Sequence, residues 1–266
     1  MDHTSNGEKT LLIGRSANLE EPMSGAYNNQ GRQLAFEPRS NYENEELFKK
    51  TVERLETLDV LTARKVELIL AATGDKRAAL LEFDTATKTR GDSEPELDDT
   101  RSRQLVDIAR DLGLYGCVVE EVRDLALESR YELESQPDMP ADLHAAHEAI
   151  VSEDILQKDR VLFAARDPAD LDEVQAANAD PDISRGNQRL GAVLGYPTSA
   201  TQAYLEGRSI PVEKTGTQDL AALAFCRYYV SPENFTAELE TARRWARSVQ
   251  QISPVIYSQF VNEHIS

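Results

Sequence analysis

The most constraining feature of the sequence is an apolar run followed directly by a strong helix start. The run Val161-Leu-Phe-Ala-Ala165 is short and apolar, which predicts a buried β-strand. Asp167 follows as a helix N-cap, and Pro168 suits the first position of the helix. The segment from about 160 to 178 is therefore expected to form a strand, a tight turn and a helix.

The rest of the chain is predicted to be mostly helical, with one further strand and two ambiguous segments. Residues 114–119 are rich in β-formers and predict a second strand, whereas 78–83 and 122–134 fit either a helix or a strand. The fold class is expected to be α+β or α/β, helix-rich with a small sheet. Apolar spacing and helix-ending residues predict helices over 41–58, 61–72, 101–112, 141–156, 183–194, 198–205, 219–225 and 235–249, with a final apolar turn or helix from 256.

Changes in composition divide the chain into four expected parts. Residues 1–42 contain several Gly and Asn with little periodicity, and we interpret them as a loose N-terminal arm. A helical segment, 43–88, follows it. Residues 89–100 form an acidic linker that contains Gly91 and Pro95. Residues 101–266 are expected to form the main helix-rich α/β domain.

A large acidic excess predicts a salt-adapted surface. The chain has 47 Asp and Glu against 29 Lys and Arg, a formal net charge of −18, and Arg outnumbers Lys. Such a charge repels itself in dilute buffer, and molar salt screens that repulsion. No apolar stretch is long enough to cross a membrane, and no secretory signal is recognised, so we expect a cytoplasmic protein. The composition is typical of a halophile.

Few residues in the sequence suggest reaction chemistry. Cys117 and Cys226 lie far apart, so no disulfide framework, metal site or cofactor is expected. His144 and His147 are three residues apart in an expected helix, with Glu148 beside them, but they do not form the zinc-protease pattern. Two half-exposed histidines are the simpler interpretation. An enzyme with a pocket that contains His144 and His147 stays as one alternative.

The segment 186–206 allows a helix-turn-helix interpretation. One helix ends at Leu194, Gly195 makes the turn, and a second helix begins near Thr198. Net charge disfavours nucleic acid as a partner, and the same pattern is also common as plain helix packing. In a DNA-binding regulator the contacts are expected from Thr198, Thr201, Gln202, Arg185, Arg189 and Arg208.

The element Leu194-Gly-Tyr-Pro197 resembles that of an uncharacterised archaeal protein family. In that family a pair of cysteines follows Gly-Tyr-Pro, whereas Ser199 and Ala200 stand at those positions here, and Tyr204 stands for a later aromatic residue. The resemblance covers roughly residues 140–250. It implies no established activity, and without the cysteine pair it implies no metal or iron–sulfur site.

These observations favour a non-enzymatic binding or scaffolding protein. Gly195 is expected to end one helix and Pro197 to open the next, with Tyr196 packed between them. The expected binding surface is the cleft around Tyr196, Pro197, Ser199 and Tyr204. The sequence indicates no ligand, no partner and no oligomeric state.

Overall fold

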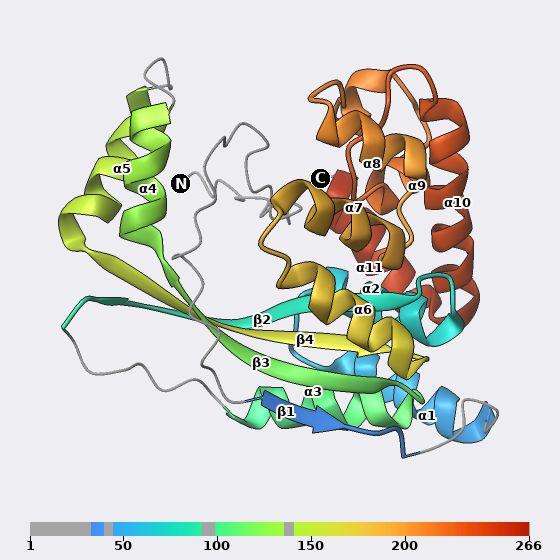
Figure 1. The fold of residues 1–266 in the computed structure, drawn as a ribbon. Coiled ribbons are helices and arrows are strands. Elements are labelled where there is room, and N and C mark those ends of the chain that lie inside the picture. Colours follow the sequence, from blue (N-terminus) through green and yellow to red (C-terminus); the bar gives the residue numbers. More distant parts are fainter. Residues whose placement is uncertain (1–32, 40–44, 92–98, 136–140, 266) are drawn as a thin grey trace, which may run out of the picture.

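The protein has a helix-rich α+β fold with one small antiparallel sheet (Figure 1). The computed structural model describes residues 33–39, 45–91, 99–135 and 141–265. The strands are β1 (Gln33–Phe36), β2 (Ala78–Thr89), β3 (Tyr115–Asp124) and β4 (Ile155–Ala165). The helices are α1 (Glu45–Thr57), α2 (Thr62–Thr73), α3 (Asp99–Asp111), α4 (Leu125–Ser135), α5 (Ala141–Glu153), α6 (Pro168–Asn178), α7 (Ile183–Val193), α8 (Thr198–Leu205), α9 (Leu220–Phe225), α10 (Phe235–Ile252) and α11 (Pro254–Ile265), with a short 3-10 turn at Val212–Thr215.

Strand β4 is central in the sheet, whose order is β1-β3-β4-β2. It pairs antiparallel with β2 on one side and with β3 on the other, and β3 also pairs with β1. Each residue of the run Val161–Ala165 is buried, which confirms the buried strand expected there. A strand with a neighbour on each side has its backbone groups paired, so a fully apolar run is stable at this position.

Successive side chains of strand β4 point alternately into two different apolar cores, as the two-residue period of a strand requires. Leu162 and Ala164 face the larger core, which contains the apolar faces of α2, α3, α10 and α11. Val161, Phe163 and Ala165 face a smaller core with Val174 of α6 and Val193 of α7. Helices α9 to α11 pack beyond α2, so the C-terminal helices form a compact group at one end of the sheet (Figure 1).

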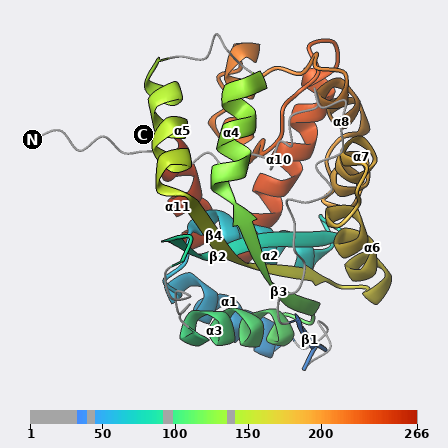
Figure 2. The same cartoon turned by 60° about the vertical axis from the view of Figure 1, so that its left-hand side comes forward.

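The opposite end of the sheet carries a helical hairpin. Strands β3 and β4 extend beyond the buried part of the sheet and lead into α4 and α5, which lie side by side (Figures 1 and 2). Burial changes along β4 accordingly: Ile155–Lys158 are half-buried, and Asp159–Ala165 are buried. The apolar cores therefore lie under the C-terminal helices and not under the hairpin.

Local turn chemistry matches the sequence closely. The Asp167 carboxylate accepts a hydrogen bond from the Ala169 backbone N–H at 2.8 Å, and Pro168 is the first residue of α6, which confirms the expected N-cap. Gly74 ends α2 with a positive φ of 82°, a conformation that glycine adopts without strain. Several boundaries differ: α5 ends at Glu153, because Ile155 and Leu156 already pair with β2 and β3, and β3 and α10 continue to Asp124 and Ile252.

The expected division of the chain needs correction at two points. The segment 43–88 contains helices α1 and α2, but its last part is strand β2. Strand β2 ends at the first residue of the expected linker 89–100, α3 begins at Asp99, and residues 92–98 between them lie outside the described part of the chain. Because β2 pairs with β4, which follows the linker, both sides of this segment belong to one sheet. Within the expected arm 1–42, Gln33–Phe36 forms strand β1, and residues 1–32 lie outside the described part of the chain.

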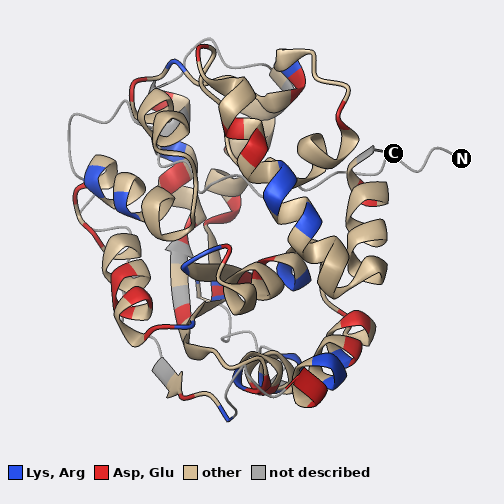
Figure 3. Ribbon diagram, turned by 90° about the vertical axis from the view of Figure 1, so that its right-hand side faces the viewer, with Lys and Arg blue, Asp and Glu red and all other residues tan. Residues whose placement is uncertain are grey.

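Charged residues are distributed over the whole fold. Figure 3 shows Asp and Glu on helices in several parts of the molecule and not on one element. In the described residues, no helix combines the length and the apolar character that crossing a bilayer requires.

Candidate functional site

The turn between α7 and α8 builds the site. Gly195 has a φ of 77° and ends the first helix, and Pro197 precedes the first residue of α8. Gly195 lies against its surroundings: a Cβ built on it lies 3.6 Å from Lys76 Cγ and 3.6 Å from Trp245 Cζ2. The turn is therefore packed against the start of β2 and against α10, and it places the Tyr196 ring against the core.

A glycine brings α7 and α8 into close contact. A Cβ built on Gly191 lies 2.5 Å from Thr201 Oγ1 and 2.9 Å from Thr201 Cγ2, so any larger residue there displaces the Thr201 side chain. Thr201 consequently faces α7 and is half-buried. A residue that the helix-turn-helix interpretation assigned to DNA therefore points toward a neighbouring helix.

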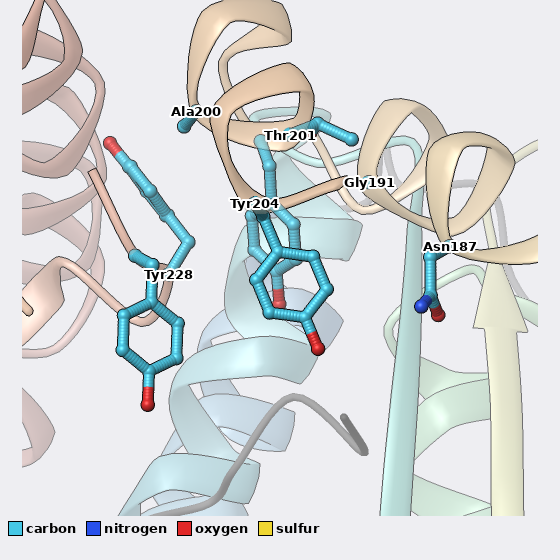
Figure 4. Close-up of a pocket in the computed structure, with 8 residues that line it drawn as sticks. Asn187, Gly191, Ala200, Thr201, Tyr204 and Tyr228 are labelled. Atoms are coloured by element: carbon cyan, nitrogen blue, oxygen red, sulfur yellow. The ribbon is translucent and has the colours of Figure 1, made fainter. Parts of the chain in front are cut away.

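A small pocket opens beside this contact, and four tyrosines dominate its walls (Figure 4). In Figure 4, Tyr204 lies between Tyr228 on one side and Asn187 on the other. The rings of Tyr204 and Tyr229 are stacked, with their centroids 6.1 Å apart. We call this site the tyrosine pocket; its lining residues are Asn187, Gly191, Tyr196, Ala200, Thr201, Tyr204, Tyr228 and Tyr229.

Two polar atoms of the tyrosine pocket lack a hydrogen-bond partner. Asn187 Nδ2 and Thr201 Oγ1 are both buried, and neither bonds to any described residue. An unsatisfied buried polar group typically costs about 1–3 kcal/mol, and native proteins contain few of them. A water molecule or a polar group of a ligand in the pocket would satisfy them.

The pocket contains no group suited to proton transfer near neutral pH. Its polar side chains are one amide, one aliphatic hydroxyl and four phenols. Burial raises the pKa of the Tyr204 hydroxyl, and it raises the pKa values of Tyr196 and Tyr228 well above the ordinary 10.0. These tyrosines stay neutral, so they offer aromatic faces and hydroxyls and no general base.

Behind the pocket lies a buried ion pair inside an aromatic cluster. The ammonium of Lys76 donates to both carboxylate oxygens of Glu67, at 2.8 and 2.7 Å, and its side chain has no solvent exposure. Lys76 Nζ also lies 4.4 Å from the centroid of a Trp245 ring and 5.3 Å from that of Tyr196. Burial lowers the pKa of Lys76, and the Glu67 carboxylate opposes this effect.

A second polar group near the pocket is fully satisfied. The buried carboxylate of Glu238 accepts hydrogen bonds from the Ser199 hydroxyl, from the Ser231 backbone N–H at 2.8 Å and from the Ser231 hydroxyl at 2.8 Å. Its backbone carbonyl accepts from the Tyr228 hydroxyl at 2.6 Å. We call these residues the Glu238 cluster; it joins α8, α10 and the segment between α9 and α10.

The residues expected to form the binding surface separate into two pairs. Tyr196 and Tyr204 both line the tyrosine pocket. Pro197 is half-buried in the turn and is not among the lining residues, and the Ser199 hydroxyl belongs to the Glu238 cluster. The structure therefore brings together the two aromatic residues of the expected cleft, whereas the Ser199 hydroxyl donates to Glu238.

The arginines of the DNA-binding alternative are paired with carboxylates of this chain. Arg185 and Arg189 bond Asp180 at 2.6 and 3.1 Å, and Arg189 also bonds Glu173 at 2.9 Å. Arg208 pairs with Glu206 and, at 3.0 Å, with Glu233. Thr198 and Gln202 are exposed on α8, and Gln202 donates to Glu206. Acidic neighbours therefore neutralise the basic residues near α8.

The two central histidines lie far from the tyrosine pocket. His144 and His147 are half-exposed on α5, at the opposite end of the sheet from α8 (Figure 1). His144 Nδ1 lies 3.7 Å from the Glu148 carboxylate, and His147 Nδ1 is buried without a described partner. A search of the described ranges finds no group of three or more His, Cys, Asp or Glu arranged to hold a metal ion.

Sequence reasoning missed two of the four tyrosines in the pocket, and it missed Asn187. Tyr228 and Tyr229 come from the segment after α9, and Asn187 from the middle of α7. The adjacent pair Tyr228-Tyr229 is the one signal that could have been found in the sequence. Cys226, for which the sequence indicates no metal or disulfide role, is buried, and burial raises the pKa of its thiol to about 12.

Comparisons with known proteins add no relative. No protein-family model, no curated protein and no solved structure matches the chain. The resemblance of Leu194–Pro197 to an archaeal family therefore stays a prediction, and the case for a function rests on the site itself.

Proposed function

We propose that the protein is a non-enzymatic binding protein and that the tyrosine pocket is its binding site. The observation that carries this proposal is the pair of unsatisfied buried polar atoms, Asn187 Nδ2 and Thr201 Oγ1, in the wall of one aromatic pocket. Ligand pockets typically combine apolar and aromatic walls with a few polar groups that orient the ligand.

The chemistry of the walls selects a small neutral ligand. None of the lining residues carries a formal charge, so the pocket offers no ion-pair partner for an anion. The Lys76 ammonium already lies 5.3 Å from the centroid of the Tyr196 ring, and it repels a second cation at this face. The net charge of −18 further repels anions. Tyrosine faces favour a planar or apolar group, and the Asn187 amide N–H requires a hydrogen-bond acceptor on the ligand.

Binding of benzamide, a neutral aromatic amide, tests the proposal. We expect the full chain to bind it with a dissociation constant on the order of 1 mM, as measured by ligand-detected NMR titration. Toluene has the ring without the acceptor and benzoate has a charge, so both should bind at least about tenfold more weakly. Thr201→Val should reduce benzamide affinity about tenfold.

Thr198→Val is the matched control for this experiment. It makes the same chemical change on the same helix, but Thr198 is exposed and outside the pocket, so benzamide affinity should not change. Absence of benzamide binding at 10 mM, a concentration about ten times the expected constant, contradicts the proposal. Equal affinity in wild type and Thr201→Val contradicts it as well.

The helix-turn-helix alternative receives less support. Arg185, Arg189 and Arg208 all pair with carboxylates of this chain, and DNA phosphates have to compete with those carboxylates. Duplex DNA titrated at low and high salt distinguishes this class, since a DNA-binding regulator loses affinity steeply as salt rises.

We also propose that the protein works in the cytoplasm of a cell that accumulates salt. The support is the charge of −18 and the preference for Arg over Lys. Far-UV circular dichroism should show a more stable fold in molar KCl than in dilute buffer, because the Debye length falls to about 3 Å at 1 M salt. Equal stability in the two solutions contradicts salt adaptation.

A further inference from the structure

The tyrosine pocket, as described, is too small for an aromatic ring. Its cavity volume is about 20 Å³, counted as the space that the centre of a water-sized sphere can occupy. That space is enough for about one water molecule, and a six-membered ring needs several times more. One wall of the pocket therefore has to move before a neutral aromatic ligand enters.

Tyr228 and Tyr196, the two pocket tyrosines whose rings contact Trp245, differ in the contacts that hold them. The Tyr228 hydroxyl donates to the Glu238 carbonyl at 2.6 Å, which anchors that ring to α10. The Tyr196 hydroxyl makes no hydrogen bond with any described residue. Its ring is held by the neighbouring aromatic rings and by the Lys76 ammonium. Of these two rings, Tyr196 is therefore the one that moves without breaking a hydrogen bond.

A third unsatisfied donor lies behind these walls. Trp245 is 1 % exposed, and its Nε1 has no hydrogen-bond partner among the described residues. Its ring centroid lies 6.3 Å from that of Tyr196 and 5.9 Å from that of Tyr228. The indole N–H and the Asn187 amide N–H only donate, so a ligand that satisfies both supplies acceptors at two points.

We infer that the Tyr196 ring swings aside on binding and that the ligand is a neutral, planar aromatic molecule with a hydrogen-bond acceptor at each end. One acceptor receives the Trp245 indole N–H, and the other receives the Asn187 amide N–H, with the Thr201 hydroxyl beside it. The inference rests on the proposed function of the tyrosine pocket, and it adds the ligand class and the moving wall.

The single tryptophan of the chain makes this inference directly observable. Trp245 is the sole Trp, so the full-length ¹⁵N-labelled protein gives one indole N–H cross-peak. The probe is isonicotinamide, which carries a ring nitrogen at one end and a carbonyl oxygen at the other. We expect this probe to move the indole cross-peak downfield, with saturation at the same concentration as the Asn187 side-chain amide.

Affinity comparisons sharpen the same test. Isonicotinamide should bind about tenfold more tightly than benzamide, which has an acceptor at one end. Trp245→Phe removes the indole N–H and keeps an aromatic ring. This variant should lose about tenfold in affinity for isonicotinamide and should bind toluene as the wild type does. If Trp245→Phe does not fold, the wild-type cross-peak alone decides.

The outcomes separate this inference from the proposed function. An indole cross-peak that stays in place during saturating, Thr201-dependent binding of benzamide or isonicotinamide overturns the inference and leaves the pocket as a binding site. Absence of any Thr201-dependent binding overturns both. A downfield shift at saturation together with weaker binding to Trp245→Phe supports both.

Discussion

Helix α8 contacts two polar clusters that differ in one respect. In the Glu238 cluster, the carboxylate has three donors and the neighbouring carbonyl has one, so each group is satisfied within the chain. In the tyrosine pocket, Asn187 Nδ2 and Thr201 Oγ1 are just as inaccessible, and no described residue satisfies them.

Under the proposed function, this difference separates residues that stabilise the fold from residues that contact the ligand. A satisfied buried network contributes to stability, and its removal leaves several donors without an acceptor. An unsatisfied buried group costs stability in the free protein, so its removal should cost nothing and should affect binding alone. The comparison therefore predicts opposite effects for substitutions only a few residues apart on α8 and its neighbours.

The largest expected effect is that of Glu238→Ala. The substitution leaves the Ser199 hydroxyl and both Ser231 donors without their acceptor, and we expect a loss of about 3–5 kcal/mol in the free energy of unfolding. Glu240→Ala on the same helix is the control, because Glu240 is exposed and pairs with Arg243 at the surface. That control should cost less than about 1 kcal/mol. Urea unfolding measures both losses, and equal losses contradict the stabilising role of the Glu238 cluster.

A smaller loss is expected for Lys76→Met, which breaks the buried ion pair behind the pocket. Glu67 is left without its partner, and since its side chain is 18 % exposed we expect a loss of about 2–3 kcal/mol. The double variant Lys76→Met/Glu67→Met removes both charges and should recover most of this loss. Urea unfolding of both variants tests this, and a double variant less stable than Lys76→Met contradicts the account of the pair.

Lys50→Met is the exposed control for the buried lysine. Lys50 pairs with Glu46 one helical turn away at the surface, and this substitution should change stability by less than about 0.5 kcal/mol. If Lys50→Met and Lys76→Met cost the same, burial does not determine the contribution of the Lys76 pair.

A pH-dependent effect is expected at Asp180, which lies in the segment between α6 and α7. Hydrogen bonds from Arg185 hold the pKa of this carboxyl far below its ordinary value of 3.8. Its stabilising contribution is present above pH 3.8 and is lost as the pH falls through the lower, folded-state pKa. Asp180→Asn should therefore be less stable than wild type at pH 7, and the difference should shrink below about pH 4. Thermal unfolding across this range tests it, and a difference independent of pH contradicts it.

Much of the local structure could be predicted from the sequence. Asp167 and Pro168 start α6 as expected, Gly195 ends α7, and the apolar run from Val161 is a buried central strand. These features depend on side chains close to one another in the chain, so their chemistry is visible in the sequence. The same signals predicted a helix-rich fold with a small sheet, whereas the antiparallel strand pairing that makes it α+β and not α/β did not follow from them.

The tertiary partners could not be predicted. The Tyr228 ring contacts the Tyr196 ring, although α8 and α9 separate the two residues in the sequence. Nothing in the sequence near either residue specifies that contact. Lys76 was overlooked because lysines are almost always exposed, and a buried one needs a partner such as Glu67 that only the fold provides. The sequence therefore predicted Tyr196 and Tyr204 as site residues, and it did not predict Tyr228, Tyr229 or Asn187.

The least destabilising of these substitutions is also the most informative. Thr201→Val replaces the unsatisfied hydroxyl with a methyl group of similar size. Without ligand, we predict an unfolding free energy equal to that of wild type or higher by up to about 1 kcal/mol. With benzamide at about 10 mM, wild type should gain about 1 kcal/mol through binding, and the variant should gain much less. A variant that loses about 1 kcal/mol or more without ligand, or that gains as much as wild type with it, contradicts the assignment of the tyrosine pocket as a binding site.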